Sequence, residues 1–136
     1  MNQVKFINPE GLMKSPAFSQ AVAIGGKGKT IYIGGQNAVN AKGEAIGKGD
    51  IAAQTEQIMK NIGIALEATG CTYKNIVKFN IYIKQGEDVQ KAFEASQKYM
   101  PNNGTPPLVT ALFVAGMGNP DYLLEVEATA FLSDYD

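Results

Sequence analysis

The segment at residues 51–69 carries the signals of both ends of an amphipathic helix. Asp50 stands where an N-cap is expected, and Gly70 stands where a C′ glycine is expected. Between them, one stripe recurs at three- and four-residue spacing, formed by Ile51, Thr55, Ile58, Ile62, Leu66 and Thr69. A helix with one such apolar stripe has to bury that stripe against another layer of structure. Strands are predicted before and after this helix in the sequence.

The remaining elements follow from changes of hydrophobic period along the chain. Strands are expected at 22–24 and 30–33 (a hairpin across the glycine-rich turn 25–29), 76–84, 108–115 and 122–132, with a second helix over about 88–99. Residues 36–49 are expected to form an irregular loop. The order ββ-α-β-α-ββ predicts one α+β domain over residues 1–136, a mixed β-sheet with two helices on one face.

The last two strands indicate a partner for the sheet. One row of strand 122–132 is wholly apolar, while the other row contains Glu125 and Glu127, and strand 108–115 is apolar on both rows apart from Thr110. Two helices of these lengths cover one face only. The second face is therefore expected to be buried against another copy of the chain, so that the protein is a homo-oligomer.

Composition excludes several kinds of site. All 12 basic residues of the 136 are lysine, against 13 acidic residues, and the chain has no histidine, no tryptophan and one cysteine, Cys71. A serine triad, a histidine base, a His or Cys metal cage and a bidentate guanidinium clamp are therefore excluded. The net charge of -1 argues against a nucleic-acid partner. With no long apolar run and no internal disulfide possible, we expect a soluble cytoplasmic protein with no membrane partner.

Several short motifs follow one another in a specific order along the chain. They are Ser15–Val22, Tyr32–Gln36, Gly49–Ile51, Gln54–Gln57, Asn61–Ile62, Leu66–Cys71, Ile76–Lys78 and Leu124–Ala128. Together these resemble the RidA/YjgF family over nearly the whole chain, from about Ser15 to Ala130. The resemblance implies a chorismate-mutase-like fold, a homotrimer with small-molecule clefts between subunits, and no cofactor or metal. The activity it implies is cofactor-independent hydrolysis of enamines and imines, such as 2-aminoacrylate, to a ketoacid and ammonia.

In that family a cleft arginine holds the substrate carboxylate, and a glutamate on the last strand positions or activates water. Glu125 falls on the glutamate position and is the candidate catalytic residue, while Glu127 faces the same way as either a solvated or a participating carboxylate. The matched cleft positions are Phe18, Gly34, Gly35, Phe93, Val109 and Thr110. Val109 stands at the arginine position, and no copy of this chain has an arginine to replace it.

The other departures from the family point in the same direction. Phe18, Gly34 and Phe93 stand where the family has tyrosine, serine and asparagine. The resulting cleft favours a neutral or aromatic ligand over a small anion, although the same residues would also suit simple packing at a trimer interface.

Two hypotheses of function remain open. The first is a divergent deaminase or hydrolase acting on an enamine, imine or related metabolite through Glu125, with little activity on 2-imino acids. The alternative is a non-catalytic binding protein for a small neutral or aromatic metabolite. A nucleic-acid role, suggested by ribonuclease and translation-inhibitor labels in the family, fits poorly with a chain that lacks histidine and arginine.

Overall fold

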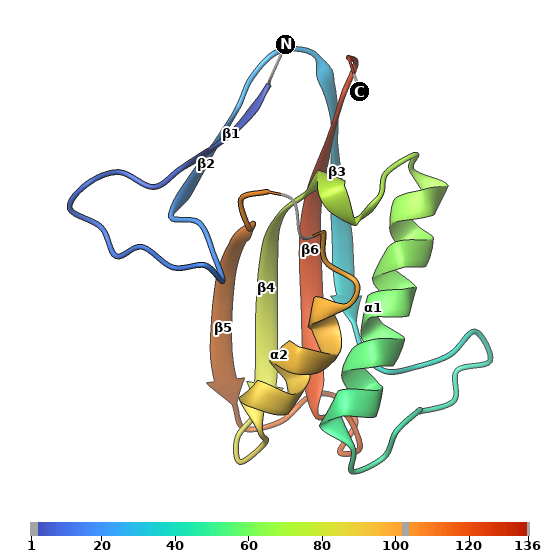
Figure 1. Cartoon of the computed structure of the whole chain (residues 1–136). Coiled ribbons are helices and arrows are strands. Elements are labelled where there is room, and N and C mark those ends of the chain that lie inside the picture. Colours follow the sequence, from blue (N-terminus) through green and yellow to red (C-terminus); the bar gives the residue numbers. More distant parts are fainter. Residues whose placement is uncertain (1–2, 102–103, 136) are drawn as a thin grey trace.

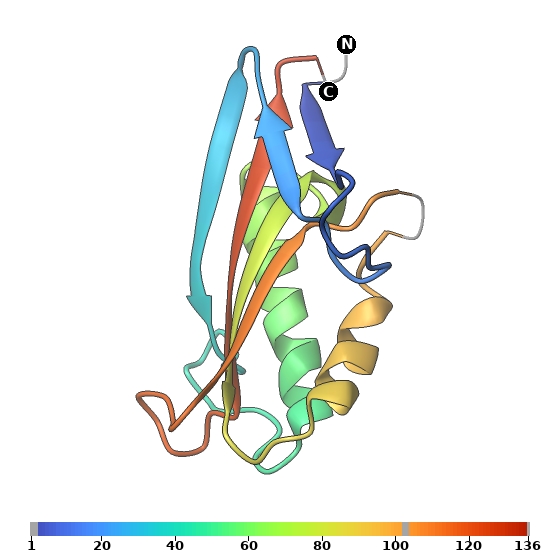
Figure 2. The same ribbon diagram turned by 90° about the vertical axis from the view of Figure 1, so that its left-hand side faces the viewer.

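The computed structural model describes residues 3–101 and 104–135 and shows a four-stranded sheet covered by two helices (Figure 1). The elements of this layer pair are β3 (Gly28–Gln36), α1 (Ile51–Ala68), β4 (Ile76–Lys84), α2 (Val89–Gln97), β5 (Leu108–Val114) and β6 (Leu124–Ser133). The strand order is β3-β6-β4-β5, with β4 and β5 parallel and β6 antiparallel to both of its neighbours. Both helices lie on the same side of the sheet (Figure 2). The predicted mixed sheet with helices on one face is confirmed.

Local capping explains where the helices begin and end. The Asp50 side chain accepts a hydrogen bond from the Ala53 N–H, and Asp88 caps α2 in the same way. Gly70 has a φ of +81°, a conformation that a C′ glycine adopts without strain. The helices end one and two residues earlier than the sequence pattern suggests.

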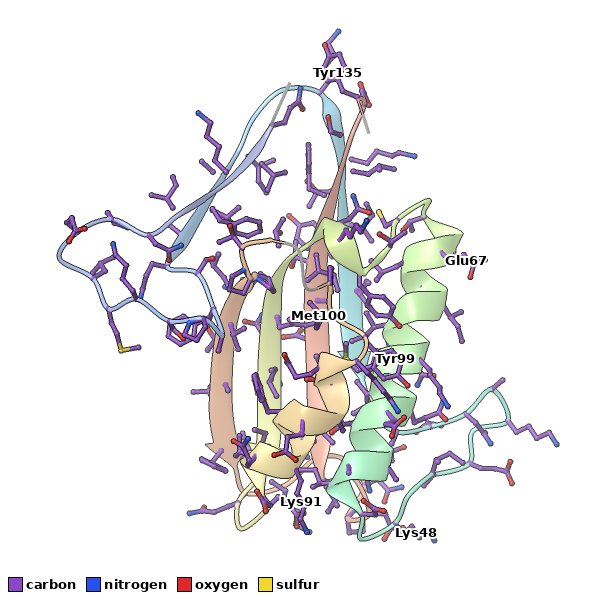
Figure 3. The ribbon with its side chains drawn as sticks, in the orientation of Figure 1. Lys48, Glu67, Lys91, Tyr99, Met100 and Tyr135 are labelled. Carbon is purple, nitrogen blue, oxygen red and sulfur yellow. The ribbon has the colours of Figure 1, made fainter. Side chains whose placement is uncertain are left out.

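The main core lies between α1 and the sheet. Ile58, Ile62 and Leu66 of α1 are 0–1% exposed, and they pack with the apolar row of β6, whose buried members are Leu124, Val126, Ala128 and Ala130. Burying each large aliphatic side chain stabilises the fold by about 1.5–3 kcal/mol. The turn that follows α2 packs on this core through Tyr99 and Met100, which are partly buried (Figure 3).

A polar contact joins the two helices at that end. Lys98 Nζ lies 2.6 Å from Glu56 Oε1 of α1, and the Tyr99 hydroxyl donates to the same carboxylate oxygen at 3.3 Å. The hydrogen bond from Lys98 holds the pKa of Glu56 below its ordinary value. This cluster lies on the helix side of the molecule.

The predicted hairpin is wrong. The segment β2 (Ala21–Ile24) pairs with β1 (Val4–Ile7) in a separate two-stranded ribbon, and its next neighbour in sequence, β3, pairs with β6. The ribbon projects to one side of the main sheet (Figure 1). The four-residue strand β1 already pairs with β2 along its whole length, and the Gly25 N–H continues that pairing to the Gln3 carbonyl at 2.9 Å. Residues 25–29 therefore join two sheets rather than two paired strands.

In the described ranges, no helix is long and apolar enough to cross a membrane.

Candidate functional site

The side of the four-stranded sheet turned away from the helices, called the open face below, carries the polar row of β6. Strand alternation and register place the following residues on it: Tyr32 of β3, Asn80, Tyr82 and Lys84 of β4, Thr110 and Leu112 of β5, and Glu125, Glu127 and Thr129 of β6. The opposite row of β6 is the buried one under α1. The two carboxylates that the sequence predicts to share a face therefore do so.

Glu125 lies against the backbone of Gly35. A Cβ built on Gly35 would fall within van der Waals overlap of the Glu125 Oε2, Cδ and Cγ atoms, the nearest at 2.2 Å, so only glycine permits this approach. The β3–β6 register shifts between Ile33 and Gln36, and Gly35 lies within this irregularity. A Cβ on Gly34 would meet nothing within 4 Å. The structure thus brings together Glu125 and Gly35, two of the residues selected from the sequence, and Gly34 precedes Gly35 with open space beside it.

Glu127 is engaged by its neighbours on β4. The Tyr82 hydroxyl donates to Glu127 Oε1 at 2.9 Å, and Asn80 Nδ2 donates to the same oxygen at 3.5 Å. The hydrogen bond to Glu127 raises the pKa of Tyr82 above its usual value, and desolvation adds to the shift. Sequence reasoning missed Tyr82 and Asn80, although their place in the polar row of strand 76–84 is a signal that they face the glutamates.

Glu125 differs from Glu127 in this respect. Across residues 3–101 and 104–135, its carboxylate takes part in no hydrogen bond and no ion pair. A half-buried carboxylate without a partner is able to accept a proton or a hydrogen bond from a water molecule.

Val109 and Thr110 lie on β5, two strands away from Glu125. Val109 is level with Phe79, whose side chain belongs to the core, so Val109 faces the helix side, while Thr110 faces the open side and is exposed. Because Glu125 is level with Tyr82 and Leu112, Val109 is roughly 10 Å away across the sheet, roughly 10 Å along it, and on the other face. One copy of the chain does not bring these two positions into one site.

Phe18 lies near the start of β5, whereas Phe93 lies on α2. Phe18 is half-buried in the loop before β2, and the next residue, Ser19, donates its N–H to the Pro107 carbonyl just before β5 at 3.1 Å. Phe93 is 42% exposed on α2, which packs on α1. The residues selected from the sequence therefore form two groups, one at the β3–β6 pair (Gly34, Gly35 and Glu125) and one at β5 (Phe18, Val109 and Thr110), with Phe93 separate on α2.

Two cavities of a single copy lie away from Glu125. One cavity, of about 460 Å³, is lined by β1 and Thr105, and another, of about 260 Å³, lies under the loop between β5 and β6 beside Lys84. Among the described residues, no three His, Cys, Asp or Glu side chains lie close enough to hold a metal ion. Cys71 is buried just past the end of α1.

Comparison with known proteins agrees with this architecture. The sequence pattern of the family described as Endoribonuclease L-PSP matches residues 12–132. A RutC family protein of Pyrococcus horikoshii is 33% identical, covering 84% of this chain and 86% of its own length, and the human 2-iminobutanoate/2-iminopropanoate deaminase is 31% identical, covering 83% and 78%. Among solved structures, the Rid family protein YyfB from Yersinia pestis superposes with a TM-score of 0.83 at 32% identity, over 96% of this chain and 100% of that one. RidA from a Psychrobacter species superposes with a TM-score of 0.68 at 25% identity, over 97% and 100%.

Proposed function

The chain belongs to the Endoribonuclease L-PSP family, also known as the RidA family, and from that membership we propose that it hydrolyses a small imine or enamine that has no carboxylate. The likeness to proteins named 2-iminobutanoate/2-iminopropanoate deaminase supports a deaminase-like role on a small molecule. The observation that carries the finer proposal is the Glu125 carboxylate, which lies over Gly35 with no partner among the described residues, in a chain without arginine.

The site is proposed to form between copies of the chain in a homotrimer. Glu125 and Val109 lie on opposite faces of one sheet, so a site that includes both groups of residues needs two copies. The open face also exposes large apolar surface, with Tyr32 81% and Leu112 52% exposed, as expected of a face that another copy covers. Light scattering at micromolar protein concentration tests this arrangement. The mass of three copies is expected, and the mass of one copy would contradict a shared site.

The substrate class follows from position 109. A guanidinium binds a carboxylate through two parallel hydrogen bonds, which valine cannot make. Apolar side chains at Phe18, Phe93 and Val109 favour a neutral, carbon-rich group instead.

We propose no nucleic-acid partner, since the net charge is -1 and the acid–base pair required for RNA cleavage is missing. The cytoplasm is the compartment we propose, because the single cysteine forms no internal disulfide.

The chemistry requires one carboxylate and one water. Water adds to the carbon of the protonated C=N bond while Glu125 accepts one proton from it, which gives a neutral carbinolamine. The Glu125 carboxyl group then returns this proton to the nitrogen, and the C–N bond breaks as the hydroxyl oxygen forms the C=O bond. The hydroxyl proton passes to the released ammonia, which leaves the carbonyl compound and ammonium. An enamine first takes a proton on carbon to reach the imine form.

The test compares two imines made in situ, a neutral one from an amine oxidase and an anionic one, 2-iminopropanoate, from an amino-acid oxidase. Carbonyl release above the spontaneous rate is expected for the neutral imine, with a loss of about 10²-fold or more in Glu125→Gln. Val109→Arg is expected to transfer activity to 2-iminopropanoate. Rapid turnover of 2-iminopropanoate by the natural chain would contradict the proposed substrate class.

A second candidate, non-catalytic binding of a neutral or aromatic metabolite, is favoured by the apolar residues Phe18, Phe93 and Val109. In that case no imine is hydrolysed faster than it decays spontaneously, and Glu125→Gln changes nothing in the same assay.

A further inference from the structure

Tyr82 lies directly opposite Glu125 in the β4–β6 ladder, yet its hydroxyl bonds to the other glutamate. Directly opposed side chains in an antiparallel pair are close, and the diagonal neighbour, about 7–8 Å away, is still within reach of a tyrosine. The Tyr82 side chain therefore leans along the sheet toward Glu127. Asn80, the cross-strand partner of Glu127, also donates to this carboxylate. The Glu125 side chain lies instead toward β3, against Gly35.

We propose that Tyr82 is a positioning residue for Glu125: by holding Glu127 against β4, it keeps the second carboxylate away from the water that Glu125 binds. This inference rests on the proposed function. It assigns the two glutamates different roles, Glu125 in the reaction and Glu127 as the anchor of Tyr82.

The physical need for such a hold comes from the spacing of the two carboxylates. Residues two apart on a strand are separated by roughly 6.6 Å, so a mobile Glu127 is able to reach the same water and to compete for its proton. The other titratable groups facing this region are Tyr32 of β3 and two lysines of β4. Lys78 lies level with Thr129 of β6, and Lys84 donates to the Pro120 carbonyl at 3.4 Å. On β5 the facing residues, Thr110 and Leu112, are uncharged. Within the described residues, Tyr82 and Asn80 are the groups that hold Glu127.

The same hydrogen bond raises the pKa of Tyr82, because a hydroxyl proton that is donated to the Glu127 carboxylate is harder to remove.

The kinetic test uses the neutral imine and four variants. Tyr82→Phe is expected to lower kcat about 10-fold with KM changed less than about 2-fold, since the ring stays and only the hold on Glu127 is lost. Glu127→Gln keeps an oxygen that accepts from Tyr82 and is expected to retain most of the activity, whereas Glu127→Ala is expected to resemble Tyr82→Phe. The control is Tyr135→Phe after the end of β6, where the side chain is 66% exposed and the hydroxyl makes no hydrogen bond in the described structure, and no change is expected.

The double variant Tyr82→Phe with Glu127→Ala is expected to be no slower than either single variant, because both remove one interaction. Fully additive losses, an unchanged kcat in Tyr82→Phe, or a rise in KM alone would each overturn the positioning role.

A second readout needs no substrate. Titration of the tyrosine ring carbons by NMR is expected to show a lower pKa for Tyr82 in Glu127→Gln, with a smaller change in Glu125→Gln. Absence of turnover in the natural chain would refute the proposed function. Equal shifts in the two variants would refute the hold of Tyr82 on Glu127, so the two failures are distinguishable.

Discussion

The two rows of β6 have the same backbone and opposite chemistry. On the helix side, Leu124, Val126, Ala128 and Ala130 are 0–5% exposed under α1. On the open face, Glu125 and Glu127 are half-buried, one without a partner in the described structure and one held by Tyr82. The strand therefore serves as a wall of the core and as a platform for a candidate site, because successive side chains of a strand point to opposite faces.

Polar groups on the two sides also differ in what they do. Glu56, Lys98 and Tyr99 on the helix side satisfy one another and join α2 to α1. Glu125 on the open face makes no such contact among the described residues. Its carboxylate is open to solvent, since no buried side-chain oxygen of these residues lacks a partner. The comparison teaches that the candidate site is marked by a polar side chain without a protein partner, Glu125, rather than by the number of polar side chains in a region.

The largest expected effect comes from breaking the helix side. Leu124→Ala removes a side chain that is 1% exposed and is expected to reduce the free energy of unfolding by about 2–5 kcal/mol, measured by urea denaturation. Leu112→Ala is the comparison on the open face, since this leucine is 52% exposed in one copy and its loss there costs less than about 1 kcal/mol. A larger cost is expected at micromolar protein concentration, because the proposed trimer covers this face, and a cost below about 1 kcal/mol at that concentration would contradict the covered face.

The next effect separates activity from stability on the open face. Gly35→Ala is expected to displace the Glu125 carboxylate and to lower imine hydrolysis about 10-fold or more, with little change in Tm because the displaced group is the flexible end of a side chain. Gly34→Ala controls for the loss of glycine itself, because its Cβ enters open space and leaves Glu125 in place. A large fall in Tm in Gly35→Ala alone would contradict this separation.

The smallest effect concerns the polar cluster on the helix side. Lys98→Met is expected to raise the pKa of Glu56 toward its ordinary value of 4.5 and to lower Tm by about 2 °C or less near neutral pH. Because the folded pKa of Glu56 lies below the unfolded one, this stabilisation is present above pH 4.5 and is lost as the pH falls through the folded value. Melting curves of both proteins at neutral and acidic pH check this, and an equal Tm difference at both would contradict it. Imine hydrolysis is expected to be unchanged.

Local signals predicted most of the fold. The caps Asp50 and Gly70 and the regular period between them placed α1 within one residue, and alternation placed β4 at its observed bounds. The ribbon of β1 and β2 was not predicted, because four residues of β1 are too few for a periodic signal and pairing partners are a long-range choice. The site was predicted in part. Glu125 and Gly35 come together, but the hold of Tyr82 on Glu127 depends on cross-strand register.

What the sequence by itself determined is the chemistry available: one polar row on β6, no histidine, no arginine, and valine at position 109. Residue types and local periodicity are properties of the chain, so they need no coordinates. Only the tertiary structure decided which strand lies beside which, and therefore that Glu125 meets Gly35 of β3, that Tyr82 bonds diagonally to Glu127, and that Val109 faces the other side of the sheet. Those relations join residues that lie 30 or more positions apart in the chain, and packing of the whole sheet, rather than any local preference, selects them.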